Sequence, residues 1–421
     1  MRRYQRYKDS GVEWIGEIPE DWVVSFYKYE IFILSGFPFK SELFDPYEGF
    51  PILRIRDISS GEIGTFYKGE CLPNYIIKRG DVIIGMDGDY NIRQWDNDDI
   101  LLNQRCCKIT PINKILLRYM FYTLPFDLKV INDLTYYTTV KHLSVEEINN
   151  IKCVIPSQSE QQSIVAFLDD KTSQIDLLIS NSQKKIELLK EKRTALINHA
   201  VTKGLDPKSK MKDSGVEWIG EIPVGWEIIR GRYILNIFSN NTPNDIIENE
   251  EGICFVKVDD LNNKSDNFYL KQTSTRILPL NAKPIEDNIL ILPKRGMAIF
   301  TNKIVISKME TYLDPNLMGI KVSDNCDIHF IFYVLSSRGL GDICDSSTIP
   351  QINNKHIYPL EFPVPELKVQ QEIVEFIMNK SSEIDKEVSL EERRIELLKE
   401  YRQSLISEVV TGKINVSDYA V

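Results

Sequence analysis

Two long segments of the chain repeat apolar or small residues every three or four positions. The first track is Ile175, Ile179, Ser182, Ile186, Leu189, Leu196 and Ala200, and the second is Ile384, Val388, Glu391, Ile395, Leu398, Leu405 and Val409. This spacing places each track on one face of an α-helix. About 40 residues at ~1.5 Å each give a helix of roughly 60 Å, and a stripe of that length needs a partner. We expect the two helices to pack antiparallel, like a coiled coil, although a helical hairpin in an ordinary core predicts the same stripe.

The rest of the chain alternates short apolar runs with turns, which is typical of mixed α/β domains. Expected strands are 51–58, 80–86, 253–261 and 287–293, and expected short buried helices are 116–124 and 327–335. Arg54 and Arg56 alternate with apolar residues, so we expect them on one face of a sheet, either as a reading surface or as a salt-bridged one. Ser159, followed by Gln162, is the expected capping box of the first long helix.

The chain is one unit written twice. The dodecamer KDSGVEWIGEIP occupies residues 8–19, the first dodecamer, and recurs unchanged at 212–223, the second dodecamer. Residues 156–204 align without gaps to 365–413, with 22 identities in 49 positions. The predicted fold class is therefore α/β (α+β): two tandem mixed α/β domains joined by two long antiparallel helices with pseudo-twofold symmetry. The predicted limits are 1–155 for domain 1, 156–205 for the first helix, 206–364 for domain 2, 365–413 for the second helix and 414–421 for a tail.

The amino-acid composition indicates a cytoplasmic protein but does not indicate a binding partner. The net charge is −10 and no segment is strongly basic, so charge alone argues against nucleic-acid binding. Seven cysteines form no CxxC pair and lie mostly in apolar segments, which favours buried thiols over zinc or disulfides and a cytoplasmic protein. No apolar run is long enough to cross a bilayer, so we expect no membrane contact.

The sequence carries no complete catalytic signature. The loops FDPYEG and LDPNLM lack the second proline of an adenine-methyltransferase loop, and GxxxxGK[ST] is absent. Asp87 and Asp89 are conceivable metal ligands, but no glutamate completes a calcium loop, and a solvated turn is the favoured interpretation. We therefore predict no catalytic residue, no metal and no cofactor.

The doubled DSGVEWIGEIPxxW, the phrases LRIRDI and VKVDDL, and helices that open P-x4-QQ-x-IV and continue through IELLKE resemble the specificity subunit of type I restriction–modification systems. This resemblance covers nearly the whole chain. It implies two target recognition domains that each read one half of a gapped DNA sequence, with the helices fixing the gap. It also implies double-stranded DNA, two methyltransferase subunits and restriction (motor–nuclease) subunits as partners, and no catalysis by the chain itself. The alternative is a non-catalytic coiled-coil scaffold that organises other proteins without reading DNA.

Base edges are read by Arg, Lys, Asn, Gln, Ser or Thr side chains on loops. Loops rich in these residues give the candidate reading residues, although each residue can equally belong to an ordinary polar loop. In the first half they are Arg93, Gln94, Asn103, Gln104, Arg105, Tyr137, Thr138, Thr139, Lys141 and His142. In the second half they are Asn262, Asn263, Lys264, Thr301, Asn302, Lys303, Ser347, Thr348, Gln351, Asn353 and Lys355. The expected structural or partner-seating residues are Trp14, Trp22, Trp218, Trp226, Ile186, Leu189, Ile395 and Leu398.

Overall fold

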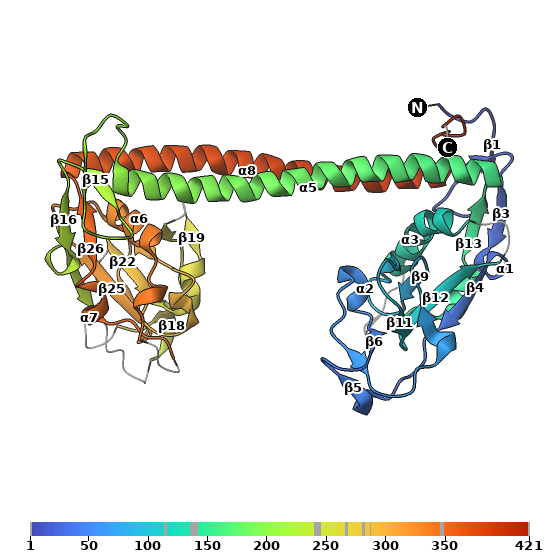
Figure 1. The fold of residues 1–421 in the computed structure, drawn as a ribbon, viewed down its shortest axis with the longest axis horizontal. Helices are drawn as coiled ribbons and strands as arrows, with labels where there is room; N and C mark the ends of the chain where they lie inside the picture. Colours follow the sequence, from blue (N-terminus) through green and yellow to red (C-terminus); the bar gives the residue numbers. More distant parts are fainter. Residues whose placement is uncertain are drawn as a thin grey trace. The chain divides into compact units, whose positions relative to one another are not determined.

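The chain folds into two compact units, each of mixed α/β structure with one stretch of both long helices (Figure 1). The computed structural model describes residues 2–112, 116–134, 142–239, 246–265, 268–279, 283–286, 288–345 and 349–419. The first unit comprises Met1–Ser182 and Arg393–Val421, and the second comprises Gln183–Glu392. The predicted fold class is confirmed.

The first unit contains two main sheets. The four-stranded sheet has the order β10 (Ile92–Gln94), β9 (Val82–Gly85), β12 (Cys106–Pro111) and β4 (Ile31–Ser35), all antiparallel. The five-stranded sheet has the order β5 (Phe44–Asp45), β7 (Phe66–Tyr67), β6 (Phe50–Leu53), β11 (Ile100–Leu102) and β8 (Ile76–Ile77). Two small pairs join β1 (Tyr7–Asp9) to β2 (Glu17–Pro19) and β3 (Val23–Phe26) to β13 (Lys152–Ile155). The helices are α1 (Tyr27–Glu30), α2 (Asp57–Ser60), α3 (Leu117–Leu134) and α4 (Val145–Asn150), with 3-10 turns at Ser41–Leu43 and Pro73–Tyr75.

The second unit also contains two main sheets, with a different distribution of strands between them. Its six-stranded sheet has the order β17 (Leu235–Phe238), β25 (Leu317–Val322), β22 (Ile289–Pro293), β23 (Val305–Ser307), β20 (Tyr269–Leu270) and β19 (Lys264–Ser265). Its three-stranded sheet has the order β21 (Thr275–Ile277), β18 (Glu248–Val256) and β24 (Thr311–Leu313). The small pairs are β14 (Met211–Asp213) with β15 (Glu221–Pro223) and β16 (Glu227–Arg230) with β26 (Glu361–Val364). The helices are α6 (Ile328–Arg338) and α7 (Asn354–Ile357), with 3-10 turns at Gly231–Tyr233, Val258–Asn262, Met297–Ile299 and Gly341–Ile343.

The phrases LRIRDI and VKVDDL fold alike, as a strand that ends in a turn closed by an aspartate. The Asp57 carboxylate accepts the backbone N–H of Arg54 at 2.9 Å, and Asp260 accepts that of Lys257 at 2.8 Å. The expectation that Arg54 and Arg56 share a sheet face is wrong, because β6 stops at Leu53 and Arg56 immediately precedes α2. The turn aspartate ends the strand before the alternation can continue.

The long helices are α5 (Gln158–Lys203) and α8 (Leu367–Val410). Within the first unit Asp176 of α5 pairs with Arg402 of α8, and within the second Lys185 pairs with Glu391 and Arg193 with Asp385. Rising numbers on α5 meet falling numbers on α8, so the helices are antiparallel, as expected. Every residue of the two predicted tracks is buried or half-buried, which confirms the stripes.

The predicted capping box of the first long helix is wrong by two residues. The Ser157 hydroxyl, rather than that of Ser159, accepts a backbone N–H, that of Glu160, at 3.3 Å. Ser159 already lies inside the helix, which begins at Gln158 because Ser157 is the first residue after Pro156 able to cap it.

The seven cysteines are all free thiols, and five of them are buried. Burial raises the pKa of both Cys106 and Cys107 to about 12, which keeps these thiols protonated and unreactive. No helix among the described residues is long and apolar enough to span a membrane.

Candidate nucleic-acid interface

The turn between β11 and β12 presents two of the predicted reading residues at the surface. Gln104 and Arg105 are exposed, whereas Asn103 is 7% exposed. The backbone is fixed on both sides, because the Gln104 N–H donates to the Phe37 carbonyl at 2.9 Å and the Arg105 carbonyl accepts from Met86 at 2.8 Å. Arg105 has φ +71°, a conformation that a non-glycine residue adopts only where its surroundings enforce it. The turn therefore holds its exposed side chains on a rigid base.

Arg105, Asp87 and His142 form a cluster beside this turn. His142 Nδ1 lies 2.6 Å from Asp87 Oδ1, and Arg105 Nη1 lies 3.6 Å from the same oxygen. Since a carboxylate only accepts hydrogen bonds, the proton on Nδ1 points to Asp87. Asp87 thus orients two polar side chains that both remain about half exposed. The structure brings together three stretches that the sequence keeps apart, at 85–91, 103–105 and 142.

Arg93 and Gln94, by contrast, are engaged within the first unit. The Arg93 guanidinium donates to the carbonyl oxygens of Ile58 and Ser59 at 3.4 and 3.5 Å, at the carboxyl end of α2, and pairs with Asp96 at 3.2 Å. The Gln94 amide donates to Gly80 at 3.3 Å and accepts from Arg118 at 2.8 Å. These contacts give both residues a structural role, and DNA contact by either residue stays a prediction.

Six predicted reading residues lie outside the described residues: Tyr137, Thr138, Thr139, Lys141, Ser347 and Thr348. Their assignment stays a prediction.

Two predicted loops of the second unit come together in the structure. Asn262 and Asn263 are exposed and Lys264 begins β19. Burial, and secondarily the charge of Lys303, lowers the pKa of Lys264. Asn302 anchors the 301–303 loop to α6 by donating from Nδ2 to the Ser336 carbonyl at 2.7 Å. Asn302 also has a positive φ of 47°, so this turn too is held by its surroundings.

The loop carrying Gln351, Asn353 and Lys355 is braced by side-chain contacts and by backbone hydrogen bonds to the segment 294–296, from Gly296 to the Pro350 carbonyl and from Ile352 to the Lys294 carbonyl, both at 2.9 Å. Gln351 Nε2 donates to Asn353 Oδ1 at 3.1 Å, and Lys355 Nζ lies 3.2 Å from Asp345 Oδ2. The hydrogen bond from Lys355 lowers the pKa of Asp345, so this carboxylate stays charged. These side chains remain candidates, with Lys355 already partly neutralised.

Each dodecamer forms a tight turn between two short strands at the end of a long helix. Asp9 Oδ1 accepts from the Gly11 N–H at 2.8 Å, and Asp213 Oδ1 accepts from Gly215 at 2.9 Å. Both glycines have a left-handed φ, of +64° and +72°. The helix ends close on these turns: Lys203 at the end of α5 donates to the Ile219 carbonyl at 3.0 Å, and Tyr7, beside the first dodecamer, donates to the Gly412 carbonyl just after α8 at 3.2 Å.

The predicted anchoring residues are all buried or half-buried. Trp22 and Trp226 are 1% and 6% exposed, whereas Trp14 and Trp218 are half-buried against the same clusters. Among the helix residues, Ile186 and Leu189 are buried and Ile395 and Leu398 are half-buried. Their packing is clear, and a role in seating a partner stays a prediction.

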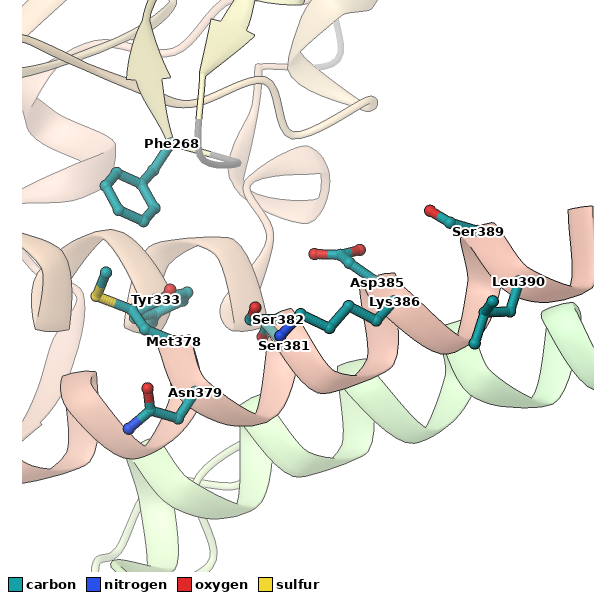
Figure 2. Close-up of a pocket in the computed structure, with 10 residues that line it drawn as sticks. All are labelled: Phe268, Tyr333, Met378, Asn379, Ser381, Ser382, Asp385, Lys386, Ser389 and Leu390. Atoms are coloured by element: carbon teal, nitrogen blue, oxygen red, sulfur yellow. The ribbon is translucent and has the colours of Figure 1, made fainter. Parts of the chain in front are cut away.

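A pocket of about 830 Å³ in the second unit lies between the α/β domain and α8 (Figure 2). Phe268 and Tyr333 form one wall, and α8 lines the other side from Met378 to Leu390. The lining mixes apolar side chains with Asp385, Lys386 and three serines. Among the described residues no group of three or more His, Cys, Asp or Glu side chains is placed to hold a metal ion.

Sequence reasoning missed Tyr269, His329 and Lys308 in the second unit. Tyr269 Oη lies 2.7 Å from His329 Nε2, and Lys308 Nζ lies 3.7 Å from the Tyr269 ring centroid. Tyr269 lies on β20 and His329 on α6, and Lys308 lies in the short connection between β23 and β24, which the search for polar loops passed over. Only the strand pairing of Tyr269 with Ile306 brings Lys308 to this ring.

Comparisons with known proteins agree with this architecture. The sequence profile of the family described as "Type I restriction modification DNA specificity domain" matches residues 19–188 and 223–400. The chain is 37% identical over 180 residues to the type I restriction enzyme EcoBI specificity subunit of Escherichia coli, covering 42% of this chain and 38% of that protein. It is 24% identical over 421 residues to the MjaVIII specificity subunit of Methanocaldococcus jannaschii, covering 95% of both chains.

Solved structures share the fold. A chain from a type I R-M system, solved in work on complex assembly and conformational transition, superimposes with a TM-score of 0.68 at 14% identity, covering 94% of this chain and 99% of that one. The HsdS subunit from Thermoanaerobacter tengcongensis gives a TM-score of 0.52 at 15% identity, covering 94% of this chain and 98% of that one. With two profile matches, two α/β regions and paired long helices, the chain belongs to the type I restriction–modification specificity subunits, the non-catalytic subunits that determine DNA target recognition.

Proposed function

We propose that each α/β region of this chain contacts one half of a gapped double-stranded DNA target and that the paired helices set the gap. The division follows the predicted limits, with domains at 1–155 and 206–364, helical segments at 156–205 and 365–413, and a tail at 414–421. The observation that carries the proposal is the contrast between the two halves. Helices and dodecamers are repeated closely, whereas the exposed loops differ, as expected if one scaffold reads two different sequences.

The partners in this proposal are two methyltransferase subunits, joined by restriction subunits, and the site of action is the cytoplasm. The dodecamers support two equal partners. Turn formation explains why both dodecamers keep the same aspartate, serine and glycine. It does not explain why both keep two exposed glutamates, which are Glu13 and Glu17 in the first dodecamer and Glu217 and Glu221 in the second. No carboxylate of these four forms an ion pair with another described residue. Identical exposed charges in both copies are expected where both copies meet the same partner surface.

Co-expression with the cognate methyltransferase tests this proposal. We expect a stable complex with two methyltransferase copies per chain by native mass spectrometry, and loss of one copy from each single charge reversal, Glu13→Lys or Glu217→Lys. The matched control is Glu387→Lys, an exposed position on α8 outside both dodecamers. A complex with one methyltransferase, or none, would overturn the proposed assembly. A complex with two copies but no sequence-dependent methylation would favour the scaffold function.

A further inference from the structure

An aromatic cluster lies beside β20 and α6 in the second unit. The ring centroids of Phe268 and Tyr269 are 4.4 Å apart, those of Phe268 and Phe332 are 6.0 Å apart, and His329 packs edge-on against Phe268 at 5.1 Å. The contact between Tyr269 Oη and His329 Nε2 fixes the orientation of the tyrosine. The cluster is therefore a rigid wall.

Three lysines surround this wall. Lys264 Nζ lies 5.8 Å from the Phe332 centroid and Lys308 Nζ lies 3.7 Å from the Tyr269 centroid. Lys303 lies on the loop that Asn302 ties to α6, the helix that carries Phe332. An ammonium over an aromatic ring keeps its charge, and its remaining N–H donors stay available for an anion.

These three lysines have no acidic partner among the described residues. Other lysines of the same unit do: Lys257 lies 3.7 Å from Glu248 and Lys321 lies 3.6 Å from Glu286. Burial, and secondarily the nearby charge of Lys303, lowers the pKa of Lys264. Two like charges held together at a half-buried place repel each other unless an anion joins them.

The chemistry of these side chains fits a phosphate better than a base. Lysine is a compact point charge without the planar fork that reads a base edge, and contacts to phosphate position a protein on DNA without reading sequence. Two of the lysines stand at the two ends of β23 rather than around one cavity, which suits an extended backbone more than a small free anion.

We propose that Lys264, Lys303 and Lys308 bind backbone phosphates of the DNA and anchor the second recognition region without reading bases. The proposal rests on the proposed function, since it requires that this region contacts DNA. It also accounts for DNA binding by an acidic chain, because a few lysines that have no acidic partner in the described part of the chain carry the phosphate contact locally.

Salt dependence of DNA binding by the complex of this chain with its methyltransferase tests the proposal. The test variant is Lys264→Gln with Lys303→Gln, and the control, Lys257→Gln with Lys321→Gln, removes the same charge from lysines that already have partners. Each phosphate contact contributes about 0.9 to the slope of log K against log salt. We expect the test variant to lower the slope by about 1 to 2, Lys308→Gln to lower it by up to about 0.9, and the control to leave it unchanged. Arginine at positions 264 and 303 should restore the slope.

The readouts separate the possible failures. Melting temperatures must match the wild-type value within about 2 °C, and Lys308→Gln, a change at an exposed position, keeps the test decisive where the double glutamine variant unfolds. A wild-type slope in the test variant overturns the proposal, as does a changed methylation motif, which would make these lysines base readers. Loss of an inorganic-phosphate-dependent rise in melting temperature, with the DNA slope intact, would assign the site to a free anion and also overturn it. If the wild-type complex binds no DNA, the proposed function fails as well.

Discussion

Arg402 of α8 donates two hydrogen bonds to the carboxylate of Asp176 of α5, from Nε to Oδ1 at 3.0 Å and from Nη2 to Oδ2 at 3.4 Å. Arg193 and Asp385 form the same ion pair with the helices exchanged, the arginine now on α5 and the aspartate on α8. In the ungapped alignment of 156–204 with 365–413, Arg193 aligns with Arg402 and Asp176 aligns with Asp385. The duplicated helix therefore pairs with its own copy through the same contact in each unit.

These two ion pairs should make small and separate contributions to stability. Both are partly exposed, so each is expected to contribute about 0.5 kcal/mol, and less at high salt. A double-mutant cycle with Arg402→Gln and Asp176→Asn, read by urea unfolding, should show the coupling, and a cycle at Arg193 and Asp385 should match it. The two cycles should add, because the pairs share no residue. Coupling in only one cycle would contradict the equivalence.

The two helix ends should differ in their tolerance of an added methyl group. Gly204 and Gly412 have φ of +75° and +73°, but an added Cβ lies 3.3 Å from Trp226 at Gly204 and only 2.3 Å from Pro19 at Gly412. We expect Gly204→Ala to lower the free energy of unfolding by about 1 kcal/mol, from backbone strain. Gly412→Ala should lower it by about 2–4 kcal/mol, because a clash with a rigid ring is added. Equal losses in chemical denaturation would show that the first dodecamer does not pack as described.

The buried carboxyl of Asp127 should make stability depend on pH. Burial raises the pKa of Asp127 from 3.8 to about 7, against the opposing effect of the hydrogen bond from Tyr27 Oη at 2.8 Å. The folded state therefore holds a proton that the unfolded state releases between pH about 4 and 7, so its contribution to stability falls as pH rises through that range and is absent above it. Asp127→Asn should stabilise the protein at pH 8 relative to wild type and remove this part of the pH dependence.

Asp170→Asn is the matched control for the pH experiment. Hydrogen bonds from Tyr419 and Lys171 lower the pKa of Asp170 in the folded state, so this group is ionised in both the folded and the unfolded state at pH 5.5 and pH 8. Its substitution should cost the same stability at pH 5.5 and pH 8. A pH-independent difference between wild type and Asp127→Asn would show that Asp127 is ionised in the folded protein.

Substitutions of two arginines in the first unit should have different effects, one on stability and the other on the DNA sequence that is recognised. Arg93→Gln should lower the melting temperature, because its guanidinium holds the carboxyl end of α2, and should leave the methylated motif unchanged. Arg105→Gln should leave the melting temperature within about 2 °C and relax the first half of the motif, at a cost of about 1–3 kcal/mol per lost base contact. The opposite assignment of effects, measured by thermal melting and methylation mapping, would place the interface elsewhere.

The periodicity of the sequence predicted the two long helices, because many residues in each helix repeat the same apolar pattern. A stripe of apolar residues every three or four positions predicts a helix that packs against a partner, and α5 and α8 pack against each other in this way. Details set by single side chains escaped prediction. Asp57 ends β6 early, and Ser157 rather than Ser159 caps α5, because one local hydrogen bond decides each case.

The sequence predicted which loops carry candidate DNA-reading residues, but it did not predict which of those side chains are exposed and which are held by contacts within the protein. Polar composition selects Arg93 and Arg105 alike, and only tertiary contacts show that one guanidinium faces backbone carbonyls while the other stays exposed. Lys308 escaped because its environment is an aromatic ring brought by strand pairing from distant sequence. Spatial convergence of this kind leaves no local pattern.

The most direct test of the account is a genome-wide map of methylated adenines in cells with this chain, without it, and with residues 227–364 replaced by those of another specificity subunit. We predict that the wild-type chain confers one asymmetric motif of two parts with a fixed gap, and that the motif disappears without the chain. In the exchanged chain one half should change while the other half and the gap persist. A map that is identical in all three cells, or an exchange that alters both halves together, would contradict the assignment of one half-site to each region.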